Sequence, residues 1–347
     1  MPASPPWWHP ASFTRRRPFL EIRGRLQAEI RGFFANRGYT EVETPALQVS
    51  PGPEPHLFAF ATEWRLPAGE PVARYLHTSP ELAMKKLLVA GSGPIFQFAQ
   101  VFRNGEAAAT HAPEFTMLEW YRPGADYRDL IAECTDLLAL AGRAAGRDGL
   151  LRWRGQTADP AKMAVLTVAE AFERYAGIDL MASLSPAGQA DAEALRRALT
   201  AVGLRSDAGD SWDDLFFRVV LEKIEPHLGF PHPTALCDYP LPLGALARPK
   251  PEDGRLVERF ELYVAGLELA NAFGELCDAD EQARRFRDFA AEKRARYGFA
   301  YPADEDFLAA LRHGMPASAG IALGFDRLVM LASGAERIED VLWAPVR

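Results

Sequence analysis

The fold is decided by one stretch of the sequence, residues 94–123, which reads PIFQFAQVFRNGEAAATHAPEFTMLEWYRP. Apolar side chains alternate with others in its first and last thirds, and this period of two is typical of strands. We predict two antiparallel strands joined by a loop from Gly105 to Pro113. Arg103 ends the first strand, while Phe115 and Glu119 lie on the returning strand. An arginine fork suits phosphate or carboxylate, and an aromatic ring can stack on a nucleobase. Taken alone, the pattern fits equally well a plain hairpin with an exposed arginine.

A second pattern consists of three glutamates in ERFELYVAGLELANAFGEL, residues 258–276. Glu261, Glu268 and Glu275 are spaced by seven in segments of strand character, with a hairpin turn predicted at Ala265-Gly266. The apolar residues around them indicate burial, and an unpaired buried carboxylate is costly. We therefore expect a cation among them, either magnesium carrying ATP or a substrate ammonium. The alternative is three exposed glutamates along one edge.

The third pattern, GIALGFDRLVML at residues 320–331, joins a strand of small residues to an apolar helix. Small residues allow a ligand to approach the backbone closely. Arg327 falls in the first turn of the predicted helix, where the helix dipole also favours anions. The alternative is a helix that begins with Asp-Arg for capping alone.

Helices are predicted on both sides of a short strand in the N-terminal part. From Phe19 onward, apolar residues recur at spacings of three and four, as on one face of a helix. YTEVETPAL, residues 39–47, then predicts a short strand. Farther on, Ser79 as N-cap and Pro80 as first residue predict a helix that stops at Gly91.

The remaining segments contain little chemistry. Residues 1–18, with several prolines and an arginine run, predict an irregular lead-in. Residues 126–230 are rich in Ala and Leu and predict a helical insertion that packs on the sheet. We expect a single large α+β domain over residues 19–347.

Composition narrows the classes of function. The chain of 347 residues has a formal net charge of -8, which argues against a broad basic surface for nucleic acid. Three cysteines without metal-ligand spacing, Cys134, Cys237 and Cys277, indicate a reducing cytoplasm. The N-terminal residues hold no apolar run of the kind that signal peptides or membrane spans require. The sequence also lacks a GxxxxGK[ST] loop, a GxSxG elbow and an HExxH motif.

Taken in order, these patterns resemble the three signature motifs of the class II aminoacyl-tRNA synthetases. GYTEVETPAL resembles motif 1 with its proline at Pro45, FRN through HAPEFTMLEWY resembles motif 2, and GIALGFDRLVM resembles motif 3. The sequences HAPEFTMLEWY, SPELAMKKLLVAG and GLELANAFGEL are similar to the corresponding segments of the lysyl branch. The resemblance runs from about Phe19 to the C-terminus and implies a catalytic domain on an antiparallel sheet flanked by helices. It also implies a homodimer built through motif 1.

Two features resemble a family of lysyl-tRNA synthetase paralogues more than the synthetase itself. Fewer than about 20 residues precede the first catalytic helix, so an anticodon-binding barrel is not expected. Motif 3 reads Ala322-Leu323-Gly324, where the synthetase typically has glycine first. The resemblance implies that ATP activates (R)-β-lysine, or lysine, as the aminoacyl-adenylate, with Mg²⁺. The aminoacyl group then passes to a lysine ε-amine of elongation factor P, and tRNA is not the expected acceptor.

The resemblance also implies roles for individual residues. Arg103 and Arg327 are the implied catalytic residues, on the α-phosphate with the substrate carboxylate and on the γ-phosphate respectively. The implied ATP-binding residues are Arg103, Asn104, Phe115, Glu268, Leu269, Gly324 and Arg327. The implied metal ligands are Glu261 and Glu268. The implied substrate-binding residues are Ser79, Pro80, Glu81, Tyr121, Glu275 and Ala322.

Motif 2 departs from the family pattern at its loop. The family usually has glutamate where this chain has Gly105, with the carboxylate one place later at Glu106, and Ala112 replaces an asparagine. Adenine would then be recognised by backbone groups or by Glu106. The alternatives are a truncated lysyl-tRNA-synthetase-like ligase acting on tRNA or another amine, and a non-catalytic regulatory paralogue.

Overall fold

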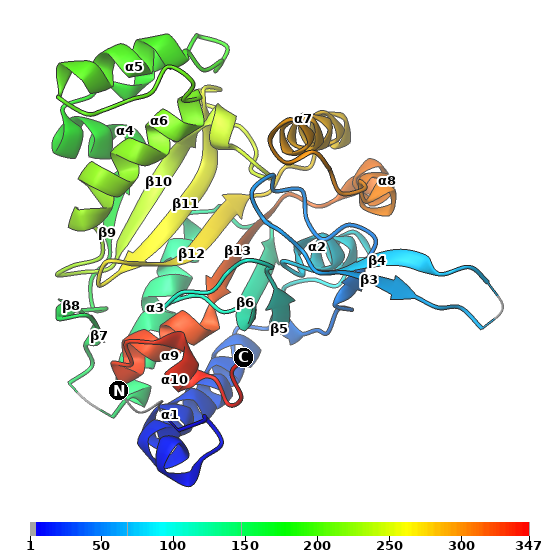
Figure 1. Cartoon of the computed structure of the whole chain (residues 1–347), viewed down its shortest axis with the longest axis vertical. Coiled ribbons are helices and arrows are strands. Elements are labelled where there is room, and N and C mark those ends of the chain that lie inside the picture. Colours follow the sequence, from blue (N-terminus) through cyan, green and yellow to red (C-terminus); the bar gives the residue numbers. More distant parts are fainter. Residues whose placement is uncertain (1–4, 68, 147, 347) are drawn as a thin grey trace.

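An eight-stranded sheet forms the centre of the computed structural model, which describes residues 5–67, 69–146 and 148–346 (Figure 1). Its strand order is β1-β5-β6-β13-β12-β11-β10-β9. All neighbours are antiparallel except β1 with β5 and β10 with β9. The strands are β1 Thr40–Glu41, β5 Ile95–Phe102, β6 Glu114–Pro123, β9 Ala164–Thr167, β10 Thr234–Pro240, β11 Leu256–Val264, β12 Leu267–Gly274 and β13 Ser318–Gly324. The predicted α+β fold with a mostly antiparallel sheet is confirmed.

The hairpin that the sequence indicated is formed by β5 and β6. Phe96 lies opposite Trp120 in this pair, and the backbone N–H of Arg103 donates to Pro113 O at 2.9 Å where the loop closes. The turn between β11 and β12 is also where it was predicted, at Ala265 and Gly266, whose φ angles are 52° and 81°. Two successive positive φ angles are the conformation that a tight two-residue hairpin requires.

Helices cover both faces of the sheet and build two hydrophobic cores. Neighbouring residues of β6 serve different cores, because Trp120 belongs to one and Tyr121 to the other. The helices of the first core are α1 Pro10–Ala35, α3 Asp129–Ala144 and α9 Phe325–Ser333. The principal helices of the second core are α2 Glu81–Val89, α5 Ala192–Ala201, α6 Trp212–Val219, α7 Ala279–Tyr297 and α8 Glu305–Gly314.

The other elements lie at the margins of the sheet. Figure 1 shows the β3–β4 hairpin projecting from the body of the molecule. The small strands are β2 Leu47–Gln48, β3 Ala61–Trp64, β4 Val72–Leu76, β7 Leu151–Trp153 and β8 Gln156–Ala158. The short helices are α4 Val168–Ala171 and α10 Ile338–Val341, the π turns Phe172–Ala176 and Val220–Ile224, and the 3₁₀ turns Leu180–Ser183, Glu225–His227 and Leu241–Leu243.

The irregular lead-in predicted over residues 1–18 is wrong for its second half, because α1 begins at Pro10. His9 accepts a hydrogen bond from the Ala11 N–H at its start, and proline suits the first helical turn. The helix continues through Pro18, and buried Arg16 in the same part of the helix donates to the carbonyls of Leu342 and Trp343. Residues 1–4 of the lead-in lie outside the described residues.

The helical insertion predicted over residues 126–230 is only partly correct. Helix α3 packs on the sheet beside α1 and α9, and β9 adds an edge strand parallel to β10. The segment thus contributes to the main sheet and is not simply a helical insertion. The strand at Ala164–Thr167 was not predicted because it pairs with β10, whose residues come 70 positions later in the chain.

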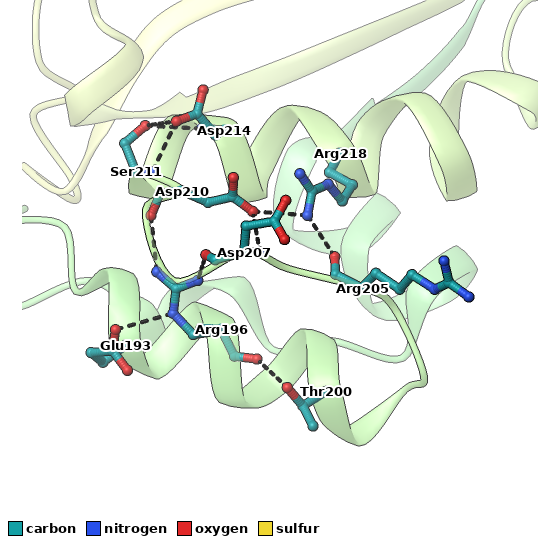
Figure 2. A network of polar contacts seen from close by, with 9 residues as sticks. All are labelled: Glu193, Arg196, Thr200, Arg205, Asp207, Asp210, Ser211, Asp214 and Arg218. Carbon is teal, nitrogen blue, oxygen red and sulfur yellow. Dashed lines mark hydrogen bonds and ion pairs between the residues drawn. The ribbon is translucent and has the colours of Figure 1, made fainter.

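Helices α5 and α6 are joined by a loop that two arginines hold in place (Figure 2). Arg196 of α5 donates to the backbone carbonyls of Asp207 and Asp210, and Arg218 of α6 donates to Arg205 O at 2.7 Å. Arg218 also pairs with the Asp210 carboxylate at 2.8 Å. This network fixes the N-terminal end of α6 relative to α5.

Helix α2 begins one residue later than predicted, at Glu81, with Pro80 at the cap position. The hydroxyl of Ser79 still accepts a hydrogen bond from the Glu81 N–H at 3.0 Å, so Ser79 stabilises the start of this helix, as the sequence predicts. None of the helices in the described ranges has the length and apolar character needed to cross a bilayer.

Candidate active site

A cavity of about 420 Å³ opens on the face of the sheet opposite α1, α3 and α9. Most of the predicted site residues line it: Ser79, Glu81, Arg103, Phe115, Tyr121, Glu268, Leu269, Glu275, Ala322, Gly324 and Arg327. Pro80, Asn104 and Glu261 are not among the lining residues. The backbone N–H of Asn104 donates to Phe58 O at 2.7 Å.

The first arginine lies at the end of β5, as the hairpin predicts. The Arg103 guanidinium is 5.2 Å from the centre of the Phe115 ring, and its Nε donates weakly to Thr78 O at 3.4 Å. Glu106 approaches it at 3.7 Å from the loop. Arg103 lines the cavity, and the guanidinium donors that Thr78 and Glu106 do not engage are available to a phosphate or carboxylate there.

The second arginine lies in the first turn of α9 and is held from three sides. Arg327 donates from Nη1 to Glu268 O at 2.7 Å and from Nε to Thr110 O at 3.3 Å. Its Nη2 lies 2.7 Å from His111 Nε2. Burial and the charge of Arg327 lower the pKa of His111, so its ring is neutral at pH 7 and Nε2 accepts this bond. His111 thus orients Arg327 without adding charge.

Two acidic residues adjoin this arginine on β11 and β12. Glu268 is exposed to the cavity, and its carboxylate has no hydrogen-bond or ion-pair partner among the described residues. Partial desolvation and the charge of neighbouring Glu261 raise the pKa of Glu268. Glu261 is already engaged, by Arg259 at 2.7 Å and by the Tyr263 hydroxyl at 2.8 Å.

This pair fits a magnesium ion that also binds phosphates. Within residues 5–67, 69–146 and 148–346 no group of three or more acidic, histidine or cysteine side chains is arranged to hold a metal. Magnesium does not need one, since it is usually bound by one or two carboxylates, retained water and the phosphates of a substrate. Glu268 offers a free carboxylate, whereas Glu261 would have to share its oxygens with Arg259.

At the opposite end of the cavity, the lining residues Ser79 and Tyr121 are joined to Glu119, which is fully buried and is not itself among the lining residues. Its two carboxylate oxygens lie 2.6 Å from the Ser79 hydroxyl and 3.0 Å from the Tyr121 hydroxyl. Burial and the nearby Glu81 raise the pKa of Glu119 to about 8. A substrate ammonium bound at this end would lower the pKa of Glu119 again, because an opposite charge favours the ionised carboxylate.

Lys85 joins the two remaining carboxylates of this end. Its ammonium, 1% exposed, contacts Glu81 and Glu275 together. Although burial opposes it, the attraction of these two carboxylates raises the pKa of Lys85. Burial raises the pKa of Glu275 despite Lys85. The cation expected beside Glu275 is therefore the protein's own Lys85. Glu275 does not share a site with Glu261 and Glu268, which lie at the other end of the cavity.

Strand β13 forms the floor under this end. A methyl group on Gly320 would collide with the Tyr121 ring and with a Glu275 oxygen, so only glycine leaves room there. Ala322 follows on the same strand and lies opposite Glu119 in the β6–β13 register. Its methyl group therefore narrows the pocket beside the buried carboxylate.

Sequence reasoning gave no role to Lys85, His111, Glu119 or Arg259. Lys85 follows Glu81 by four positions on a helix, a spacing that brings opposite charges together and was readable. Glu119 precedes Tyr121 by two positions on a strand, so both had to share a face. Arg259 precedes Glu261 by two positions on a strand, so this pair was readable in the same way. His111 acts through a contact with Arg327, 216 positions away, for which local sequence gives no signal.

The chain matches known proteins over nearly its whole length. The family described as tRNA synthetases class II (D, K and N) matches residues 12–347. Elongation factor P--(R)-beta-lysine ligase of Photorhabdus laumondii is 43% identical over 340 residues, covering 96% of each chain. The enzyme of the same name from Proteus mirabilis is 41% identical over 342 residues, covering 98% of this chain and 97% of the other. That from Pectobacterium carotovorum is 40% identical over 341 residues. The chain therefore belongs to the class II tRNA synthetase family, in the group of the elongation factor P--(R)-β-lysine ligases.

Proposed function

We propose that this enzyme activates (R)-β-lysine with ATP and transfers the aminoacyl group to a lysine ε-amine of elongation factor P. The observation that supports this most strongly is the division of one cavity between two kinds of group. One end presents Arg103 and Arg327, and the other presents Glu81 and Glu275, with buried Glu119 hydrogen-bonded to the lining residues Ser79 and Tyr121. A substrate with a carboxylate and two ammonium groups, placed beside a triphosphate, complements both ends.

The first step forms the adenylate. A carboxylate oxygen of the amino acid attacks the α-phosphorus of ATP, a P–O bond forms, and the bond to pyrophosphate breaks. Arg103 would neutralise the α-phosphate and the attacking carboxylate, while Arg327 would hold the γ-phosphate side. Charge stabilisation and alignment of this kind can supply most of the rate enhancement without a covalent enzyme intermediate.

The second step consumes the adenylate. The neutral ε-amine of the acceptor attacks the carbonyl carbon, an amide bond forms, AMP leaves with the bonding electron pair, and the amine loses a proton. The chain does not change covalently in either step, so its part is to bind, orient and exclude water.

The remaining predicted residues complete the nucleotide end. Phe115 would stack on adenine, while Asn104, Leu269 and Gly324 would border the nucleotide. Mg²⁺ would be held by Glu268 with Glu261 and would supply charge neutralisation on the phosphates. The free carboxylate of Glu268 supports this assignment more directly than Glu261, which is paired with Arg259.

The acidic end would bind the two substrate amines. Ser79, with Pro80 behind it, and Glu81 would receive one amine, and Tyr121 and Glu275 the other. Glu119 is hydrogen-bonded to Ser79 and Tyr121, one member of each pair, and would act on the amines through its charge. Ala322 would set the depth of the pocket and so favour a β-amino acid over its α-isomer.

We also propose that the enzyme is a homodimer formed through the motif 1 region, α1 and β1. Leu47, the last residue of motif 1, and Val49, just after it, are 39% and 45% exposed although apolar, which is consistent with a protein partner there.

The reaction is tested by pyrophosphate exchange into ATP, with (R)-β-lysine or L-lysine, followed by mass spectrometry of elongation factor P. We expect faster exchange with the β-isomer and a mass increase of the acceptor that requires both ATP and the amino acid. Exchange with L-lysine alone, combined with charging of tRNA, would instead identify a synthetase-like ligase. Absence of exchange with either isomer would show that the Gly105 and Ala112 changes have disabled adenylate formation.

A further inference from the structure

The cavity has a third region beside its predicted nucleotide and amino-acid ends. It is bordered by the segment Glu54–Phe58, by α6 and by α7. Its lining includes His56 from the segment, Asp213 and Phe217 from α6, and Phe289 and Glu292 from α7. This region leads from the two predicted binding ends toward the surface, where Phe217 is 41% exposed.

The segment Glu54–Phe58 is fastened to α7 by one buried lysine. Lys293 is 2% exposed, and its ammonium donates to Pro55 O at 2.8 Å and to Leu57 O at 2.7 Å. Its remaining surroundings are aromatic rings, whose centres lie 4.6 to 5.7 Å away: Phe58, Tyr297, Phe299 and Tyr301. Carbonyls and ring faces together can compensate a buried ammonium.

Further contacts hold the same segment at its far end. The backbone N–H of Ala59 donates to the Tyr301 hydroxyl at 2.8 Å. Phe58 O accepts from the N–H of Asn104, which adjoins Arg103. His56 Nδ1 lies 3.0 Å from the Tyr297 hydroxyl. The segment is therefore a fixed wall, and every polar group that Lys293 contacts is a backbone carbonyl of this wall.

The charges around this region are mostly negative. Glu54, Asp213 and Glu292 place three carboxylates on its three sides, although Glu292 is also paired with Arg296 at 3.2 Å. An extended alkylammonium side chain complements such a passage, because aromatic residues contact its methylene groups and carboxylates attract its charge.

We propose that Glu54–Phe58 is the wall along which the acceptor lysine of the partner protein reaches the adenylate, and that Lys293 is the positioning residue for this wall. The inference rests on the proposed function, since it concerns the second step of that reaction. Lys293 touches neither the nucleotide nor the amino acid end. We therefore expect its loss to affect acceptor transfer more than adenylate formation.

The test separates the two half-reactions in Lys293→Met. Pyrophosphate exchange with (R)-β-lysine, and release of AMP with hydroxylamine as a small nucleophile, should stay within about twofold of the unchanged enzyme. Transfer to elongation factor P should lose about tenfold or more in kcat/KM, because misplacement of a reacting group by about 1 Å is costly. Lys293→Arg retains the charge and the donors, and it should recover most of the transfer. Arg294→Met, on the exposed side of the same helix, is the matched control.

Unimpaired transfer in Lys293→Met would overturn the inference and leave the proposed function intact. An equal loss of exchange and transfer would also overturn it, because Lys293 would then support the whole site. If Lys293→Met does not fold, Tyr301→Phe removes only the hydroxyl that holds Ala59, and the same selective loss of transfer is expected in smaller degree. Failure of exchange in the unchanged enzyme would refute the proposed function itself.

Discussion

Glu119 is a single buried carboxyl behind the lining residues Ser79 and Tyr121, and we propose that its protonation controls how the cavity receives a cation. Its pKa of about 8 leaves most molecules protonated at pH 7 when the cavity holds no amino acid. The ionised form attracts a substrate ammonium, which stays charged up to about pH 10. Binding therefore improves as pH rises through 8 and weakens as pH falls below it.

We expect the KM for (R)-β-lysine in pyrophosphate exchange to fall about tenfold between pH 7 and pH 9, as one ionising group requires. Glu119→Gln should raise KM and remove most of this dependence, since the amide does not titrate. Glu275 lies at the same end, and its pKa is also raised. Glu119→Gln therefore shows how much of the pH dependence of KM is due to Glu119 alone. A pH profile unchanged by the substitution would contradict this role.

Residues with a distinctive local context were predictable from sequence. Arg103 at a strand end and Arg327 in the first turn of a helix both line the cavity as expected. The three glutamates were less predictable as a group, because spacing by seven does not show which residue meets a lysine from another helix. Lys85 pairs with Glu275 only through the tertiary fold.

At the scale of elements, the attachment of α1 to α9 depends on one buried ion pair. Arg23 and Asp326, with side chains 8% and 1% exposed, contact each other directly. Arg23 also donates to the Thr116 hydroxyl at 2.8 Å, and Asp326 accepts from the Thr116 N–H at 2.8 Å. One triad therefore joins α1, β6 and α9, beside the arginine of motif 3.

Arg23→Met should lower the free energy of unfolding by about 3–5 kcal/mol, because it leaves the Asp326 carboxylate buried without its cation. Arg17→Met removes a pair with Glu21 that is exposed on both sides, 67% and 60%, and should change stability by at most about 0.5 kcal/mol. Urea unfolding of both variants measures the difference. Equal effects would show that the buried triad contributes no more than a surface pair.

Elements with strong local periodicity were predicted well, and those that depend on distant partners were not. The β5–β6 hairpin follows from alternation within 30 residues, and the turn at Ala265-Gly266 from two permissive residues. Strand β9 has four residues and one strand neighbour, supplied by β10, so its own sequence could not identify it. The start of α1 was missed because its prolines were interpreted as irregular chain.

At the scale of the whole molecule, we expect light scattering at micromolar concentration to give a mass near twice the 38.3 kDa of one chain. Replacing Leu47 and Val49 with glutamate should shift the mass toward that of one chain, because charges at an apolar interface are costly to bury. Leu221→Glu, at a 60% exposed position in the π turn after α6, is the control and should leave the mass unchanged. A monomeric unchanged enzyme would contradict the dimer.

Whole-chain architecture was predictable only as far as the three motifs reached. They identified an antiparallel sheet with flanking helices, but the order of its strands required the structure. In particular, β6 pairs with both β5 and β13, and the second of these partners comes from near the end of the chain.

The pairing of β6 with β13 has a consequence for how the enzyme is made. Thr110 and Arg327, which meet at the nucleotide end, are 217 positions apart in the sequence. At translation rates of about 5–20 residues per second, a ribosome needs about 10–40 seconds to add such a span. Throughout that interval β6 has an open edge, and such edges favour aggregation of unfinished chains. A nascent chain therefore cannot assemble both arginines before β13 has left the ribosome, and this enzyme should depend on chaperones during its synthesis.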